Sequence, residues 1–536
     1  MDKVLRAHIK KNPFLGSYLN KVQSQTGMPR FYQECPDWSD LQKDFNIIYP
    51  VTDIVYTHCF QGEEEKRYNS IEPPLTNEMK EKLKQAKKYI YREADYDREI
   101  EYREELREMI NEIFDRLVGK KGKGLFTKLK GQSLDVKDKE IPILKYYVNR
   151  DLVDYGKLDP LLNDPNIEDI NCVGTDVLTL IHKTFGRTKT NISFDDALEL
   201  EEYLKKISQR VGSPVGEAHP IVDTAMPDGS RINIVYPEDV STKGRSFTIR
   251  KFPEDPISIT NLIKWNTLSS KLAAYIWLCL ENSMSIFICG ETASGKTTTL
   301  NACLPFVHLD SKIYSVEDTP EVQPPHDNWQ QLIVREEGPE EEQVGQFDLL
   351  KAALRSRPDY IVPSEIRGEE GRVAFQAMQT GHPVVSTFHA NSIHRMIQRL
   401  TGQPIKIPIT FIDNLNVAVI QDSFRTAGAV LRRVTEVGEI MGYSKEQQGV
   451  MMRVVFKRDH EKDRLDFEGM YNSFILEDKI AKIQGYDDTR KIYEVMDERA
   501  RFLEDLVRKR IFDYNKVAQL IEEYRKGGRE NLSIRL

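Results

Sequence analysis

The first quarter of the chain alternates between apolar and charged stretches and predicts a mixed start. The run Phe45–Phe60 is apolar and β-branched, which is typical of strands. Thr76 or Asn77 is a capping residue before a long charged stretch, and we expect one helix from there to about Val118. The Gly/Lys-rich stretch 119–132 has no apolar period and predicts a hinge.

The stretch from about 140 to 250 mixes strand-like runs with one helical period, which predicts a compact α+β domain. The expected helix is Asp195–Val211, and the expected strands are Asp169–Val173, Leu178–His182 and Phe247–Arg250. Two prolines in Phe252–Pro256 break any regular element, so we expect a linker there.

From Ile257 onward short apolar runs alternate with helical periods, which predicts a parallel α/β sheet. The expected strands are Ile286–Cys289, Ile313–Val316, Tyr360–Val362 and Val384–Thr387. This pattern ends around Gly442. We expect a polar strand pair next, Arg453–Arg458 with Met470–Leu476, and then a helix with apolar positions from Ile492 to Val507.

These patterns divide the 536 residues into five expected segments. They are an N-terminal helical and strand extension (1–135), an α+β N-terminal domain (136–251), a linker (252–258), an α/β domain (259–440) and a C-terminal extension (441–536).

Charge and cysteine content exclude some classes of protein. The net charge is −8 and the pI is about 5.9, so the chain lacks the overall basic character of many nucleic-acid-binding proteins. Six scattered cysteines form no CxxC pair, which favours a reducing compartment over a disulfide framework. Glu281, Asn282 and Ser283 interrupt the most apolar stretch, Leu272–Cys289, so we expect any membrane role to be peripheral or through a partner.

One motif carries a specific chemistry. Gly290-Glu-Thr-Ala-Ser-Gly-Lys-Thr297 fits GxxxxGK[ST] and lies between an apolar strand and the start of a helix, as a phosphate-binding P-loop requires. Such a loop wraps backbone N–H groups around an anion at a helix N-terminus. The expected nucleotide-binding residues are Gly290, Thr292, Ala293, Ser294, Gly295, Lys296, Thr297 and Thr298.

Acidic and histidine side chains at other strand ends complete the candidate site. Glu365 follows the apolar run Tyr360–Val362 and is the expected carboxylate beside Mg²⁺, whereas Asp359 precedes that run and falls at the wrong end. Glu317 ends another strand, where it can polarise the attacking water. His382 and His389 flank the run Val384–Thr387, where a histidine can contact a γ-phosphate or relay its loss, although a packed histidine is the more ordinary interpretation. A zinc site is excluded, because no cysteine or carboxylate lies at ligand spacing.

Taken in order, four segments resemble the secretion ATPases of type II secretion and type IV pili. GETASGKTTT is similar to that family's Walker A motif, IYSVEDTPE to its acidic Asp box, LRSRPDYIVPSEIRGEEG to its Walker B segment and TGHPVVSTFHANS to its His box. HPIVDTAMPDGSRIN and GRSFTIRKF are similar to the archaeal branch, which drives the archaellum and archaeal pili.

The resemblance implies a RecA-like P-loop motor domain behind an α+β N-terminal domain, in a homohexamer. It also implies a cytoplasmic ATPase that needs ATP and Mg²⁺, acts on a polytopic inner-membrane platform protein and binds no nucleic acid. By motif position, Lys296 and Thr297 hold phosphate and Mg²⁺, Glu317 resembles the catalytic base, and Glu365 resembles the acid that reaches Mg²⁺ through water. The nucleotide contacts that it adds are His382, His389, Arg231 and Arg245 or Arg250.

One departure leaves alternatives open. Pro363 and Ser364 precede Glu365 where the family has small apolar residues and glycine, so we expect the strand to end one residue early and turnover to be weak. A RecA-like nucleic-acid translocase or helicase is the alternative function, although the sequence has no basic stretch interleaved with aromatic residues. A nucleotide-binding scaffold with little turnover is the third interpretation.

Overall fold

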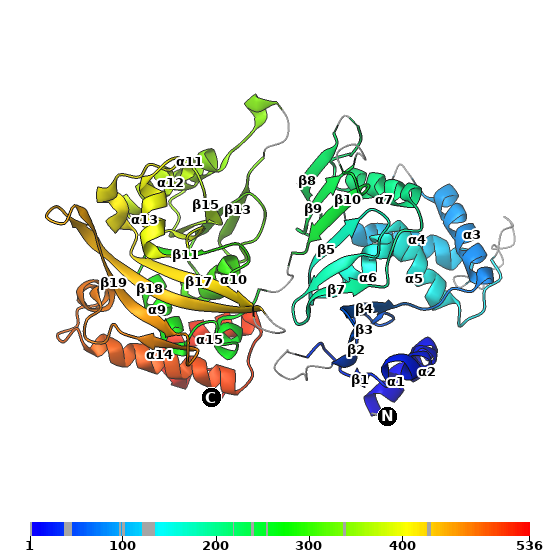
Figure 1. Cartoon of the computed structure of the whole chain (residues 1–536), viewed down its shortest axis with the longest axis horizontal. Coiled ribbons are helices and arrows are strands. Elements are labelled where there is room, and N and C mark those ends of the chain that lie inside the picture. The colour runs from blue at the N-terminus through cyan, green and yellow to red at the C-terminus, as the bar shows by residue number, and fades with distance from the viewer. Residues whose placement is uncertain are drawn as a thin grey trace. The chain divides into compact units, whose positions relative to one another are not determined.

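The computed structural model of the chain divides into two compact units, residues 1–252 and 253–536 (Figure 1). It describes residues 3–36, 45–95, 98, 102–119, 134–217, 219–236, 241–252, 256–335, 339–425 and 430–535. Most of the expected Gly/Lys hinge at 119–132 and residues 253–255 of the expected linker therefore lie outside the described residues. Within the described ranges, no helix combines the length and the apolar character that crossing a membrane requires.

A ten-stranded sheet forms the centre of the first unit, in the order β1-β2-β3-β4-β7-β6-β5-β10-β9-β8. Its strands are β1 Arg30–Phe31, β2 Asn46–Pro50, β3 Tyr56–Gln61, β4 Lys66–Ile71, β5 Ile167–Val173, β6 Thr179–His182, β7 Gly186–Thr190, β8 Ile221–Ala225, β9 Arg231–Val235 and β10 Ser246–Arg250. The helices are α1 Lys3–Lys11, α2 Pro13–Thr26, α3 Asn77–Glu93, α4 Arg103–Leu117, α5 Ile141–Leu152, α6 Asp159–Leu162 and α7 Ala197–Arg210.

The expected separate extension, residues 1–135, is not separate in the structure. Strand β4 pairs in parallel with β7, with Tyr68 opposite Thr190, so the N-terminal strands continue the same sheet. Asp164, which is fully buried, accepts hydrogen bonds of 2.7 and 2.8 Å from the hydroxyl groups of Tyr49 and Tyr68. These long-range contacts bind the two segments together, and hydrophobic periodicity along the chain does not reveal them.

The single long helix expected up to Val118 is wrong. Thr76 caps α3 as predicted, by accepting a hydrogen bond of 3.2 Å from the backbone N–H of Met79. However, α3 ends at Glu93, because Ala94 has extended backbone angles, and α4 begins only at Arg103. The two helices pack with α5 around a core of their own, so the apolar stripe of α4 is buried.

In the second unit, a seven-stranded sheet has the order β15-β16-β11-β17-β18-β19-β20 and a three-stranded sheet the order β13-β12-β14. The strands are β11 Ile286–Gly290, β12 Ile313–Glu317, β13 Trp329–Ile333, β14 Tyr360–Pro363, β15 Glu365–Ile366, β16 Val385–Phe388, β17 Val417–Arg425, β18 Val430–Ser444, β19 Gly449–Asp459 and β20 Arg464–Phe467. The helices are α8 Ile259–Lys264, α9 Ser270–Glu281, α10 Lys296–Cys303, α11 Gln346–Arg355, α12 Glu370–Gln379, α13 Ile393–Thr401, α14 Lys491–Arg508 and α15 Tyr514–Gly527.

The expected parallel α/β core is present. Strands β11, β16 and β17 pair in parallel, as do β12, β13 and β14, whereas β17 through β20 are antiparallel. The core strands are buried along their full length, as parallel strands covered by helices on both faces should be.

The C-terminal segment, residues 441–536, is also part of this unit. Strand β18 continues through Gly442 to Ser444, and α14 packs on α9, where Phe502 lies 6.0 Å from Trp277 between ring centroids. The expected strand Met470–Leu476 is wrong: β19 pairs instead with β20, and a π-helix occupies Phe474–Ala481.

Candidate functional site

The GxxxxGK[ST] motif forms the turn between the buried strand β11 and helix α10. The strand ends at Gly290, and α10 begins at Lys296, with Gly295 as its capping residue at a φ of +91°. A side chain at Gly290 is excluded, because a Cβ there would lie 2.2 Å from the carbonyl oxygen of Gln421. Gly290 thus allows the close approach of the Gln421 backbone, and Gly295 allows the left-handed turn that leads into the helix N-terminus.

The other motif residues differ in exposure. Ser294 is fully buried, and its hydroxyl group has no hydrogen-bond partner. Thr292 is exposed, Ala293 has a φ of +63°, and Thr297 and Thr298 are half-buried in the first turn of α10. The buried orphan hydroxyl and the left-handed backbone are features of a loop shaped around a ligand.

Lys296 is 8% exposed, and its ammonium group donates a hydrogen bond of 3.2 Å to the carbonyl oxygen of Glu291 within the loop. Burial lowers the pKa of Lys296, and the charge of Glu365 opposes this effect. A buried amine at the N-terminus of a helix strongly favours an anionic ligand, because the ligand charge repays the cost of desolvation.

Glu365 lies at the same end of the sheet. Strand β15 pairs with β16, so Glu365 is opposite Thr387 and its side chain reaches His389. Nε2 of His389 lies 2.7 Å from Oε1 of Glu365, in a geometry that leaves this buried oxygen without an aligned hydrogen-bond donor. The other carboxylate oxygen, Oε2, accepts a hydrogen bond of 2.7 Å from Nε of Arg367.

His389 is a neutral partner for this carboxylate. Burial lowers its pKa, and the positive charges of Lys296, Arg367 and Arg399 add to this effect, while Glu365 acts in the opposite direction. A neutral imidazole near pH 7 can donate or accept a proton, which suits a contact with phosphate or water.

Glu317 is more enclosed than the sequence suggested. It ends β12 and is fully buried; its carboxylate accepts hydrogen bonds from the backbone N–H groups of Glu321 and Val322, at 2.6 and 2.8 Å, and from Gln331 at 3.0 Å. Burial raises the pKa of Glu317, and these hydrogen bonds act in the opposite direction without cancelling the rise. The more exposed Glu321, which sequence reasoning missed, is close enough to raise the pKa of Lys296. Its signal in the sequence is a third acid in the segment Glu317-Asp-Thr-Pro-Glu321.

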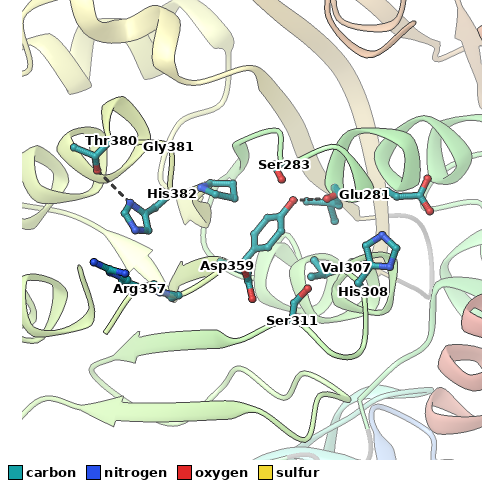
Figure 2. Close-up of a pocket in the computed structure, with 14 residues that line it drawn as sticks. Glu281, Ser283, Val307, His308, Ser311, Arg357, Asp359, Thr380, Gly381 and His382 are labelled. Atoms are coloured by element: carbon teal, nitrogen blue, oxygen red, sulfur yellow. Dashed lines mark hydrogen bonds between the residues drawn. The ribbon is translucent and has the colours of Figure 1, made fainter. Parts of the chain in front are cut away.

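His382 lies at the opposite end of the sheet, so the prediction that it binds nucleotide is wrong for this loop. Strands β11 and β16 are parallel, with Ile286 opposite Val385 and Cys289 opposite Phe388. His389 therefore follows the end that carries the loop, and His382 precedes the other end, roughly 20 Å away along an extended chain. His382 instead lines a cavity of about 550 Å³ with Arg357 and His308, where its Nδ1 lies 3.2 Å from the Thr380 hydroxyl (Figure 2).

The three predicted arginines all lie in the first unit. Arg231 begins β9 and forms an ion pair of 2.7 Å with Asp223, and it stands opposite Arg250 in the β9–β10 pairing. Arg245 lies 3.1 Å from Glu201, with its guanidinium 5.0 Å from the ring centroid of Tyr236. Their contact with the nucleotide stays a prediction.

A model of the family described as type II/IV secretion system protein matches residues 154–456. An uncharacterised protein of Methanocaldococcus jannaschii is 49% identical over 545 residues, which cover 98% of this chain and 98% of that protein. The protein VirB11 of Agrobacterium fabrum is 28% identical over 316 residues, 52% of this chain and 89% of that protein. The solved structure of the Yersinia pseudotuberculosis ATPase DotB covers 68% of this chain and 91% of its own, at 18% identity and a TM-score of 0.40.

Proposed function

The chain belongs to the type II/IV secretion system protein family, and from this premise we propose that it hydrolyses ATP to ADP and phosphate at the loop from Gly290 to Thr298. The observation that supports this proposal most directly is the meeting of three groups at one end of the parallel sheet. They are the GxxxxGK[ST] loop with its buried Lys296, the carboxylate of Glu365 and the neutral imidazole of His389.

The residues present fit a nucleotide with Mg²⁺. The left-handed turn at Ala293 and Gly295 directs the loop toward a phosphate, and Thr297 stands in the first turn of α10. Mg²⁺ prefers few protein oxygens and several waters and phosphate oxygens, so Thr297 and, through water, Glu365 suffice to hold it. When bound, the ion neutralises charge that develops on the transferring phosphoryl group.

The protein's own side chains supply positioning and charge. Lys296 and the N–H groups of the loop hold the β- and γ-phosphates, and this arrangement stabilises negative charge where it grows. Glu317 is the proposed catalytic base, and burial raises its pKa, which makes its carboxylate a stronger proton acceptor. His389 and Arg367 contact Glu365 and fix the orientation of its carboxylate, which would hold Mg²⁺ through a water.

Family membership supports a proposal for the larger assembly. We propose a homohexamer of the archaeal branch, located in the cytoplasm and held at the membrane by a polytopic platform protein. It drives a type IV pilus-like filament, an archaellum or protein secretion. In that assembly Arg231 and Arg245 or Arg250 reach the nucleotide. The exposed position of Arg231 is consistent with such a contact.

The decisive experiment is steady-state ATP hydrolysis by the full chain, with Lys296→Ala beside the wild type. Lys445→Ala, in the exposed turn between β18 and β19, is the matched control. Each protein is assayed alone, with anionic liposomes and with DNA at low salt. Turnover that only Lys296→Ala abolishes, and that DNA leaves unchanged, supports the proposal. Stimulation by DNA that fades with salt favours the translocase, and no turnover in any condition favours the scaffold.

A further inference from the structure

Gln421 lies beside the phosphate loop, although it is more than 120 residues away in sequence. It belongs to β17, the strand next to β11, and it is 1% exposed. We propose that Gln421 is a positioning residue that holds the loop in its ligand-binding conformation, an inference that rests on the proposed ATPase activity.

Both ends of the Gln421 side chain are engaged. Its amide nitrogen Nε2 donates a hydrogen bond of 2.7 Å to the carbonyl oxygen of Ser294, and its oxygen Oε1 accepts one of 2.7 Å from the hydroxyl group of Thr299. Since a carbonyl oxygen can only accept, the contact with Ser294 fixes which end of the amide is the nitrogen. Gln421 thereby joins the last turn of the loop to the first turns of α10.

A β-bulge aims this side chain at the loop. Ile420 is opposite Glu436 in the β17–β18 pairing, whereas Gln421 is opposite Val434, so Thr435 is an extra residue. Bulges often lie next to active sites, where they redirect one side chain out of the regular alternation of a strand. The irregularity at Ile420/Gln421 is therefore part of how the strand presents Gln421.

The bond to Ser294 fixes the direction of the loop backbone. In a phosphate-binding turn the N–H groups point inward to the anion, so the carbonyl groups point outward and need donors of their own. Gln421 serves the carbonyl of Ser294, and Arg432 on β18 serves that of Ala293 with a hydrogen bond of 3.1 Å. The fit is tight, because a Cβ on Gly295 would lie 2.9 Å from Nε2 of Gln421.

Removing the two side-chain hydrogen bonds of Gln421 should weaken ATP binding more than it weakens the fold. Gln421→Met keeps the length and apolar volume of the side chain but can form neither hydrogen bond. We expect its Kd and KM for ATP to rise about tenfold, the equivalent of about 1.4 kcal/mol, with kcat within about threefold of the wild type. A purely structural glutamine would lower thermal stability and leave the Kd unchanged.

Gln421→Glu supplies a signature that simple destabilisation does not. A carboxylate can still accept from Thr299, but it can donate to the Ser294 carbonyl only when protonated. Affinity for ATP should therefore recover toward the wild type as the pH falls from about 8.5 to about 6, a range in which a buried glutamic acid can titrate. Gln421→Met measured over the same pH range should show no such recovery.

Tyr275→Phe is the matched control, since it removes another buried hydrogen bond of the same unit, 2.8 Å long, from Tyr275 to Glu439. ATP binding is measured by titration calorimetry, beside the thermal midpoint of each protein without nucleotide. A raised Kd in Gln421→Met but not in Tyr275→Phe, with pH-dependent rescue by Gln421→Glu, supports the inference. Wild-type affinity in Gln421→Met overturns it, whereas a wild type that binds no ATP overturns the proposed function instead.

Discussion

Gly295→Ala places one methyl group at the most constrained position of the phosphate loop. The backbone φ of Gly295 is +91°, a conformation that costs a residue with a Cβ roughly 1–2 kcal/mol. The added Cβ would also lie 2.9 Å from Nε2 of Gln421 and 3.0 Å from Cδ of Arg432. Arg432 can move aside, but Gln421 is buried and bonded at both ends, so the loop itself must shift.

The effect on ATP binding can be worked from the bonds at stake. A shifted loop loses one charge-assisted bond from a backbone N–H to phosphate, about 1.5–3 kcal/mol, so the Kd for ATP should rise between about tenfold and about a hundredfold. The Gln421–Ser294 bond is present without nucleotide, so its loss, about 1 kcal/mol, adds to backbone strain as a cost to the fold. The Tm should therefore fall by about 4–12 °C for a unit of this size.

Gly381→Ala is a control that adds backbone strain without a steric clash of the new Cβ. Gly381 has a similar φ of +86°, but a Cβ there meets nothing within 4 Å, and the residue lies at the opposite end of the sheet beside His382. Titration calorimetry with ATP and thermal unfolding are run on both variants. We expect a smaller fall in Tm in Gly381→Ala, about 2–8 °C, and a lost affinity only in Gly295→Ala. Equal affinities in the two variants would refute the placement of Gln421 against the loop.

Three further predictions concern Glu365, the proposed catalytic carboxylate, and the first unit. Glu365→Gln should lower turnover at least about a hundredfold with ATP affinity within threefold, as steady-state kinetics and calorimetry will show; an equal loss of affinity would contradict a catalytic role. Asp164→Ala should lower the free energy of unfolding in urea by about 3 kcal/mol, because Tyr49 and Tyr68 each lose a hydrogen bond to a charged group. Burial lowers the pKa of His182 to about 4. Between about pH 6.5 and 4, His182 is therefore protonated in the unfolded state and neutral in the folded state. Stability should fall by up to about 1.4 kcal/mol per pH unit from pH 6.5 toward 4, and an NMR titration with His182 protonated at pH 5.5 would contradict this.

The local motifs were the predictable part of the second unit. The core strands and the start of α10 fall where periodicity and the glycine spacing put them, since both signals are confined to a few neighbouring residues. The place of His382 is predictable from strand direction. Asp359 precedes its strand and lies at the end away from the loop, and His382 likewise precedes β16, which is parallel to β11.

Contacts between distant segments were not predictable from local patterns. The pairing of β4 with β7 and the hydrogen bonds from Tyr49 and Tyr68 to Asp164 depend on residues about 100 positions apart. The contact of Gln421 with the loop is likewise not predictable from the sequence, because a glutamine at the end of the apolar run VAVIQ resembles the polar end of any strand. The break between α3 and α4 has no glycine or proline to mark it.

Pro363 does not shorten its strand, and the structure explains why. Backbone N–H groups alternate sides along a strand: that of Ser364 bonds to Val316 on β12, while that of Ile361 bonds to Pro383 at the start of β16. The missing N–H of Pro363 therefore faces β16. Before this point Ile361 forms a bridge with Val384, and after it β15 pairs with β16. Pairing with β12 still runs through Pro363. Glu365 then pairs with β16 beside His389, so the proline gives no structural reason to expect weak turnover, and the scaffold interpretation loses the sequence feature that supported it.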